Sequence, residues 1–106
     1  MTPEELNIAC AKARGWIRMP DGPDWLPKNS MKSQSIPNII SDANAQRDAF
    51  LELSEEQKET FVCLLHQKCR HEFLDVYTGQ IQFIKTFFTH FAEIYLKTVA
   101  PEKWKD

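Results

Sequence analysis

Glycine is scarce in this chain of 106 residues, which contains only Gly15, Gly22 and Gly79. Average proteins contain about 7% glycine, roughly twice as much. The spacings between these three residues fit neither the GxGxxG loop that binds dinucleotides nor the GxxxxGK[ST] loop that binds phosphates. The sequence therefore excludes both kinds of nucleotide-binding loop.

Long apolar segments and an even set of cysteines are also missing. No uninterrupted run approaches the ~20 apolar residues of a membrane span, and the first residues have neither the basic start nor the apolar core of a signal peptide. The cysteines are Cys10, Cys63 and Cys69, so at least one of them is unpaired within the chain. We therefore expect a cytoplasmic protein that does not contact membranes.

Positive charge is not concentrated in any one segment. The chain has 13 basic and 15 acidic residues and a net charge of -2. Its two weak basic groups are Lys12, Arg14 and Arg18, and Lys68, Arg70 and His71. A helix that reads a DNA groove shows a stronger basic stripe, so the charge pattern does not favour nucleic-acid binding. The alternative is a nucleic-acid-associated regulator in which Trp16 or Trp25 stacks on bases.

The overall composition is that of a folded protein. Apolar residues make up 42% of the chain and charged residues 26%, which is close to the globular average. We expect a single domain over residues 1–106, in which residues 1–40 form a helix plus a hairpin or loop and residues 41–100 are helical.

The first helix has clear signals at both ends. Thr2 is suited to the N-cap, Pro3 to the first helical position, and Glu5 stands three residues after the cap, as in a capping box. Gly15 follows Arg14 where a C-terminal glycine is expected. These signals predict a helix over residues 3–14.

Proline and turn residues interrupt the next segment. Four of the six prolines fall between residues 20 and 37. The turn sequence at residues 21–24 predicts a short hairpin between Gly15–Met19 and Asp24–Leu26. Each proline removes a backbone donor, so the sheet is expected to be small. The polar stretch at residues 28–35 predicts a surface loop.

From residue 41 onward the pattern is helical. Ser41 or Asp42 is suited to cap a helix that continues to Leu53, and Ser54 with Gln57 forms a second capping box before a helix over residues 55–70. A last helix is predicted over residues 79–99. The predicted fold is α+β and mostly helical, with three to four helices packed with a short antiparallel hairpin.

The last predicted helix has an unusually wide apolar face. This face is either the centre of the core or an interface with a second chain or a partner protein. The two tryptophans near the hairpin have the same two interpretations, as core anchors or as an exposed binding site. The candidate partner or dimer interface therefore comprises Trp16, Trp25, Phe83, Phe87, Phe88 and Phe91.

The strongest candidate for metal chemistry is the group Cys63, His66, Cys69 and His71. Zinc prefers thiolate and imidazole ligands, but side chains at this spacing spread around a continuous helix, whereas structural zinc sites usually join two elements. Small apolar packing is the favoured interpretation of the cysteines, and a small zinc-binding protein stays an alternative.

Catalytic groups are weakly indicated. A cysteine–histidine nucleophile pair lacks a nearby glycine-rich turn or helix start that would lower a thiol pKa. The glutamates at positions 52, 55, 56 and 59 are typical of a solvated helix start. We expect no enzyme activity, no cofactor and no bound metal.

Several short motifs resemble the phage ABA sandwich domain family of small phage and prophage proteins. They are MTPEELNIA at residues 1–9, Gly15-Trp16 followed by a loop rich in tryptophan and proline, Ile36-Pro37-Asn38, Asp42-Ala43-Asn44-Ala45, Phe91-Ala92-Glu93, Leu96-Lys97-Thr98 and Trp104. The likeness covers residues 1–65 and 90–104, and the sequence departs from the family pattern between Cys63 and His90. The resemblance implies a helix, a small antiparallel sheet and further helices, and it implies no assigned chemistry and no catalytic residue.

The resemblance and the composition together lead to a functional hypothesis. The sequence is typical of a non-catalytic phage or prophage accessory protein that binds a host or phage protein in the bacterial cytoplasm. Inhibition of a host defence system, as by anti-CRISPR proteins, is the specific form of that hypothesis.

Overall fold

The computed structural model describes residues 1–69 and 84–104. These residues form a mostly helical α+β fold with a two-stranded antiparallel hairpin, which confirms the predicted fold class. The described residues contain five α-helical segments, one more than the upper limit of the prediction. The elements are α1 (Pro3–Ala13), β1 (Ile17–Arg18), β2 (Trp25–Leu26), α2 (Ala43–Leu51), α3 (Glu55–Cys69), a helical segment at residues 84–89, α5 (Phe91–Val99) and the 3-10 helix η1 (Pro101–Lys103).

The two ends of α1 form as the sequence predicts. The Thr2 hydroxyl accepts a hydrogen bond from the Glu5 amide at 3.1 Å. At the other end Gly15 has φ +87°, and the amides of Gly15 and Trp16 donate to the carbonyls of Lys12 and Ala11, both at 3.0 Å. This is a Schellman motif, which needs a left-handed residue at the position that glycine occupies here.

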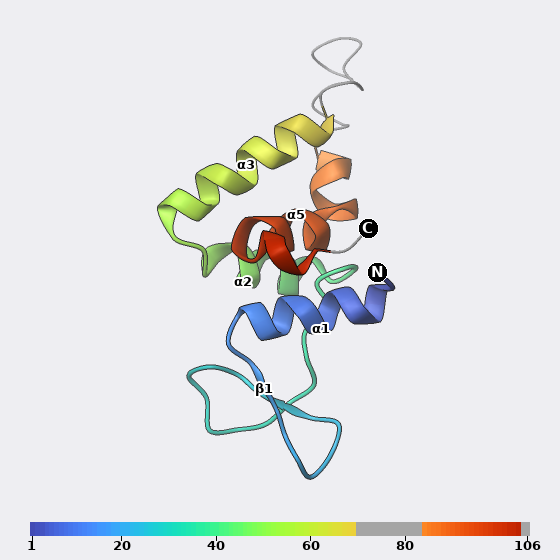
Figure 1. Ribbon diagram of the computed structural model, residues 1–106, viewed down its shortest axis with the longest axis vertical. Helices are drawn as coiled ribbons and strands as arrows, with labels where there is room; N and C mark the ends of the chain where they lie inside the picture. Colours follow the sequence, from blue (N-terminus) through green and yellow to red (C-terminus); the bar gives the residue numbers. More distant parts are fainter. Residues whose placement is uncertain (70–83, 105–106) are drawn as a thin grey trace.

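The predicted hairpin is present and short. β1 and β2 are antiparallel, with Ile17 opposite Leu26 and Arg18 opposite Trp25. Trp25 also exchanges two backbone hydrogen bonds of 2.8 Å with Gln34, which form an antiparallel bridge. The chain therefore forms two loops on the far side of α1 from the helical part (Figure 1).

Side-chain caps define the start of α2 and α3. Asp42, and not Ser41, caps α2, because its carboxylate accepts hydrogen bonds from the amides of Asn44 and Ala45 at 3.0 and 3.4 Å. Before α3 the Ser54 hydroxyl accepts from the Gln57 amide at 3.1 Å, and the Gln57 side chain accepts from the Ser54 amide at 3.0 Å. The predicted capping box is therefore confirmed.

The last helix is not continuous, and this part of the prediction is wrong. His90 leaves helical geometry, with φ -112° and ψ 16°, and separates residues 84–89 from α5, which runs in a different direction (Figure 1). Residues 86–91 are threonine, phenylalanine and histidine, which have only moderate helix propensity, so packing decides the course of the chain. Residues 79–83 of the predicted helix lie outside the described residues.

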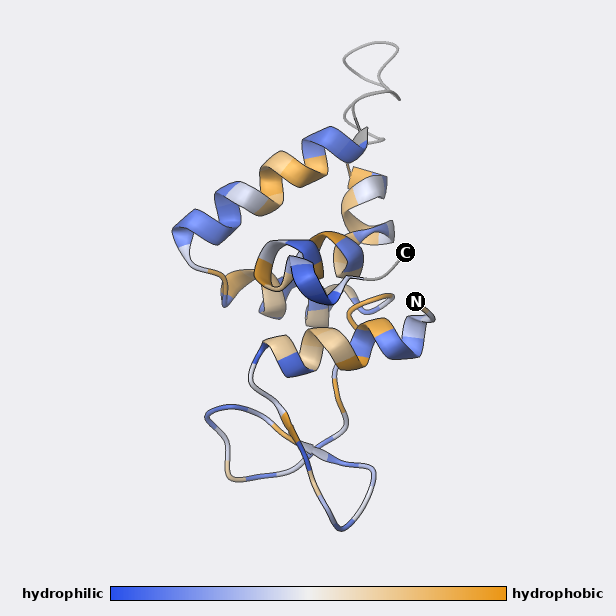
Figure 2. Ribbon diagram, viewed as in Figure 1, coloured by the Kyte–Doolittle hydropathy of each residue, from blue (hydrophilic) through white to orange (hydrophobic). Residues whose placement is uncertain are grey.

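The main core surrounds α5, which lies between α3 and α1 in Figure 1. Figure 2 shows the hydrophilic start of α3 and the hydrophobic middle that reaches this core. The fully buried large side chains of the main core include Phe61, Leu65, Phe91 and Leu96. A second, smaller cluster, here called the tryptophan cluster, consists of Ala11, Trp16 and Trp25, with Ile8 and Ile36 packed against it.

The helix α1 is shared by both clusters. Cys10 belongs to the main core and the adjacent Ala11 to the tryptophan cluster. The side chain of Asn7 adds a link to the segment before α2: it donates to the Asn38 side chain at 3.2 Å and accepts from the Ile39 amide at 3.1 Å. α1 therefore fixes the hairpin region against the helical part of the molecule.

Candidate functional site

The two tryptophans of the predicted interface are buried. Trp16 is 8% exposed and Trp25 is 6% exposed. The guanidinium of Arg14 lies over the Trp16 ring, 5.6 Å from its centroid, and forms an ion pair with Glu52 at the end of α2. Of the two interpretations offered by the sequence, the structure gives these side chains the role of core anchors.

The phenylalanines of the predicted interface divide between core and surface. Phe91 is fully buried and Phe87 is half-buried, and their ring centroids lie 5.2 and 5.8 Å from that of Phe61. Phe88 is 46% exposed. Phe83 lies outside the described residues. Adjacent residues of a helix point about 100° apart, so within the segment of residues 84–89 Phe87 faces the core and Phe88 lies on the outside.

An exposed apolar surface results on the segment of residues 84–89. Ile84, which is 56% exposed, stands four residues before Phe88, so the two side chains are neighbours on one helix face. Phe88 also borders a shallow depression of about 620 Å³, whose other lining residues are Ile40, Ser41, Ala43, Gln46 and Thr89. We call Ile84, Phe88 and the depression the Ile84–Phe88 surface.

The side chain of Gln46 connects the Ile84–Phe88 surface to the segment before α2 by hydrogen bonds. The residue is 1% exposed, and its side-chain amide nitrogen donates to the backbone carbonyls of Ile39 at 3.0 Å and Phe88 at 3.1 Å. The amide oxygen is buried and has no hydrogen-bond partner among the described residues. No local pattern in the sequence indicates this contact, because Gln46 and Phe88 are 42 positions apart.

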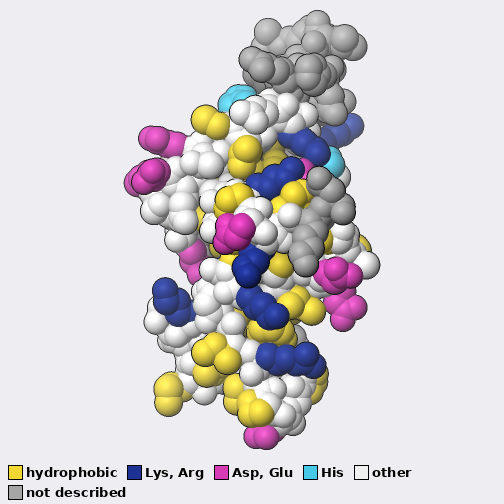
Figure 3. Space-filling model, viewed as in Figure 1, with side chains coloured by type: hydrophobic (Ala, Val, Ile, Leu, Met, Phe, Trp, Pro, Cys, Tyr) yellow, Lys and Arg dark blue, Asp and Glu magenta, His cyan; other side chains and the backbone are white. Residues whose placement is uncertain are grey.

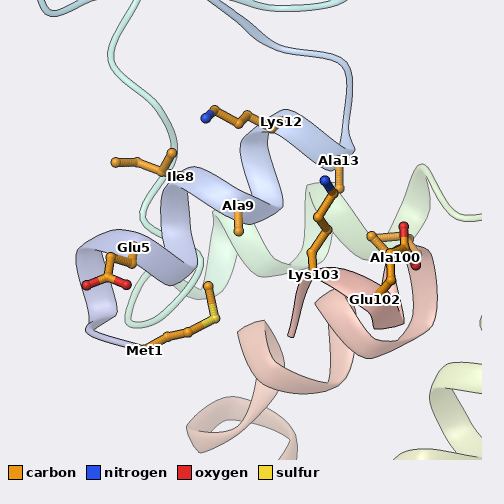
Figure 4. Close-up of a pocket in the computed structure, with 10 residues that line it drawn as sticks. Met1, Glu5, Ile8, Ala9, Lys12, Ala13, Ala100, Glu102 and Lys103 are labelled. Atoms are coloured by element: carbon orange, nitrogen blue, oxygen red, sulfur yellow. The ribbon is translucent and has the colours of Figure 1, made fainter. Parts of the chain in front are cut away.

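A second concave region lies between α1 and the C-terminal residues. It is a groove of about 580 Å³ with the apolar side chains of Met1, Ile8, Ala9, Ala13, Val99 and Ala100 and the charged side chains of Glu5, Lys12, Glu102 and Lys103. Figure 4 shows Ala9 facing the groove and Lys103 reaching across it toward Ala13. We call this region the α1 groove.

Basic side chains follow one another along the face seen in Figure 3, from the level of α3 down to that of the hairpin. Two lysines, Lys68 and Lys97, share the Glu93 carboxylate at 3.1 and 3.2 Å. Lys97 also lies over the Trp104 ring, 5.0 Å from its centroid.

The predicted cysteine–histidine group is only partly described. Cys63 and His66 are exposed on α3, whereas the side chain of Cys69 and all of His71 lie outside the described residues. Within the parts of the chain that the structure describes, no three histidine, cysteine or acidic side chains come close enough to hold a metal ion.

The thiols at positions 10 and 63 have opposite environments. Cys10 is buried, and burial raises the pKa of its thiol to about 12, although the nearby charge of Arg14 acts in the other direction. Its thiol donates a hydrogen bond to the Ala92 carbonyl at 3.6 Å. A thiol with this pKa stays protonated near neutral pH, so Cys10 is suited to packing rather than to nucleophilic attack.

The glutamates considered for acid–base chemistry lie on the surface. All four, at positions 52, 55, 56 and 59, are exposed. Glu52 pairs with Arg14, and Glu55 pairs with Lys58 at 3.4 Å. Solvated carboxylates in ion pairs lack the apolar surroundings that prepare a general acid.

Comparisons with known proteins add no relative. No protein-family model, no curated protein and no solved structure matches the chain. The resemblance to the phage ABA sandwich domain family therefore stays a prediction. In the described residues no helix is both long enough and apolar enough to cross a membrane.

Proposed function

We propose that this protein is a non-catalytic phage or prophage accessory protein that binds a protein of the bacterial host cytoplasm and thereby inhibits a host defence system. The single observation that carries the binding role is the Ile84–Phe88 surface, where two large apolar side chains are 56% and 46% exposed. The phage setting rests on the sequence resemblance.

The chemistry of this surface suits contact with another protein. Aromatic and aliphatic side chains beside a depression are typical centres of protein interfaces, and a handful of such residues often supplies most of the binding energy. Gln46 fixes the backbone of Phe88 beforehand, so less conformational entropy is lost on binding.

The non-catalytic role is supported by where displaced pKa values occur. Burial raises the pKa of the Cys10 thiol and of the Tyr95 hydroxyl, and both groups belong to the main core. Glu93 is occupied by two lysines. These groups have packing and pairing roles, rather than the open position that a reacting group needs.

The test uses Phe88→Asp and a matched control, Leu51→Asp. Leu51 is 61% exposed on α2, so the control makes the same chemical change outside the Ile84–Phe88 surface. Each protein is produced in bacterial strains that carry one defence system and in isogenic strains without it, and phage plating efficiency is measured. We expect the unmodified chain and Leu51→Asp to raise plating on a defence-positive strain and Phe88→Asp to fail.

Binding is then measured with the purified defence component of the responsive strain. Loss of a central aromatic residue is expected to weaken binding at least ~tenfold. If the unmodified chain raises plating on none of the strains, defence inhibition is wrong. If it does so and Phe88→Asp is equally active, the Ile84–Phe88 surface is the wrong site.

A nucleic-acid-associated regulator is the second candidate, favoured by the basic side chains along the face in Figure 3. The predicted stacking of Trp16 or Trp25 on bases is not compatible with the structure, because both side chains are buried. It predicts binding to DNA or RNA that weakens steeply with salt, because each phosphate contact releases counterions. The absence of a mobility shift at low salt would remove this candidate.

A further inference from the structure

One side of α1 carries an ordered set of accessible side chains. The residues that α1 and the preceding methionine contribute to the α1 groove recur at helical spacing, and we call them the α1 face: Met1, Glu5, Ile8, Ala9, Lys12 and Ala13. Glu5 and Lys12 are exposed, whereas Ile8 and Ala9 are half-buried and rest on the tryptophan cluster and the main core, respectively.

The two charges on this face do not neutralise each other within the chain. Glu5 lies in the first turn of α1 and Lys12 in the last. Seven residues of helix separate them by about 10 Å along the axis, which is too far for an ion pair. The ion pairs found among the described residues involve neither side chain.

The charges of the α1 face are complementary to those of a second, antiparallel copy of the same face. In a second α1 that runs antiparallel, with the midpoint between Ile8 and Ala9 as the centre, Glu5 stands opposite Lys12 of the second copy. Lys12 stands opposite Glu5 of the second copy by the same symmetry. An interface in which the same patch serves both subunits is what a twofold axis requires. Antiparallel helix dipoles also attract rather than repel.

The shape of the face agrees with its charge. Ala9 is small and faces the groove, and Ile8 provides an apolar contact near the proposed axis; Lys103, which reaches toward Ala13, must move aside for a second helix to approach closely. The groove beside α1 is lined by two acidic and two basic residues, so a purely anionic or purely cationic ligand meets repelling as well as attracting charges there. A helix with an acid at one end and a base at the other can place both of its charges opposite attracting ones.

We propose that two copies of this chain associate through the α1 face, with their α1 helices antiparallel and Glu5 of each copy paired with Lys12 of the other. α1 has 11 residues, so this contact is smaller than the roughly 1,200–2,000 Å² of a stable interface. The dissociation constant is therefore expected near ~10–100 μM, well above the nanomolar range. This interface is separate from the Ile84–Phe88 surface and does not depend on the proposed function.

The test is a charge-reversal series followed by sedimentation velocity over concentrations that span the expected dissociation constant. Glu5→Lys places two lysines opposite each other in the pair, and Lys12→Glu places two acids there. Each single reversal is expected to weaken self-association at least ~tenfold, because like charges then face each other and repel. The double reversal restores the pairing, and so does an equimolar mixture of the two single variants.

Matched controls carry the same charge changes elsewhere. Glu59→Lys on α3 and Lys32→Glu in the loop after β2 are both exposed, and they are expected to associate like the unmodified chain. Circular dichroism checks that each variant is folded. Recovery in the mixture distinguishes lost pairing from lost folding, because mixing two unfolded chains restores nothing.

Three results would overturn the proposal. The first is that the unmodified chain sediments as a monomer at every concentration. The second is that the single-reversal variants associate as strongly as the unmodified chain. The third is that the mixture of the two variants stays dissociated although both are folded. Self-association that ignores the α1 reversals and disappears in Phe88→Asp would assign the interface to the Ile84–Phe88 surface instead.

Discussion

Single residues set the junction between α1 and the hairpin. Gly15 adopts φ +87°, a backbone conformation that side chains with a Cβ rarely adopt. A Cβ at this position would also meet the Lys28 side chain at 3.1 Å. The same residue therefore ends the helix and allows the chain to pass beside Lys28 toward the hairpin.

We expect Gly15→Ala to lower the free energy of unfolding by ~1–2 kcal/mol, through strain at positive φ. Gly22→Ala is the matched control, because its φ is not positive and a Cβ there meets nothing within 4 Å. The control is expected to change stability by no more than ~0.5 kcal/mol. Urea unfolding followed by circular dichroism measures both, and equal losses would contradict the role given to Gly15.

A pair of helices, α3 and α5, is joined by charged side chains as well as by the main core. Glu93 on α5 accepts hydrogen bonds from Lys68 on α3 and from Lys97 one turn later on its own helix. Partial burial on its own would raise the pKa of Glu93, but the two hydrogen bonds and the lysine charges lower it below its ordinary value of 4.5. The folded state therefore favours the ionised carboxylate.

This lowered pKa predicts how stability depends on pH. The contribution of Glu93 is fully present above its pKa in the unfolded chain and is lost as pH falls through its lower pKa in the folded state. At neutral pH we expect Glu93→Gln to be less stable than the unmodified chain by ~0.5–1 kcal/mol. The difference should shrink as the pH falls below the ordinary value of 4.5.

Urea titrations at several pH values test this, with Glu56→Gln on the exposed side of α3 as the control. The free energy of unfolding of the control is expected to change with pH in the same way as that of the unmodified chain. A constant difference for Glu93→Gln would show that its effect is not electrostatic.

At the scale of the whole molecule, two clusters share one helix. The main core holds α1, α2, α3 and α5 together, whereas the tryptophan cluster holds the hairpin region to α1. Trp25 is central to the tryptophan cluster, because the residue is only 6% exposed and its backbone pairs with both Arg18 and Gln34.

Trp25→Ala is therefore expected to open the hairpin region without unfolding the helices. The cavity and lost burial cost ~3–5 kcal/mol locally, and regions that share few contacts open independently. Hydrogen exchange with mass spectrometry should show lost protection in residues 17–36 and retained protection in α3 and α5. Met31→Ala, at a fully exposed side chain, is the control. Equal loss of protection in α5 would mean that both clusters form one cooperative unit.

Local signals explain why much of the fold was predictable. The boundaries of α1, the hairpin turn and the start of α3 depend on residues within three or four positions of one another, such as Thr2 with Glu5 and Ser54 with Gln57. The break at His90 could not be predicted from the periodicity of apolar residues, because this periodicity assumes a straight helix. Whether Phe87 or Phe88 faces inward is decided by packing against Phe61, which lies far away in the sequence.

The sequence by itself determined the class of fold, the ends of its first helices and the hairpin, because caps, turns and glycine conformation act over short distances. The tertiary structure alone decided which aromatic side chains are buried and which charges stand together. Trp16, Trp25 and Phe91 lie in cores, and Ile84 and Phe88 stay exposed. Burial depends on what the rest of the chain places against a residue, and for Phe88 that includes Gln46, 42 positions away.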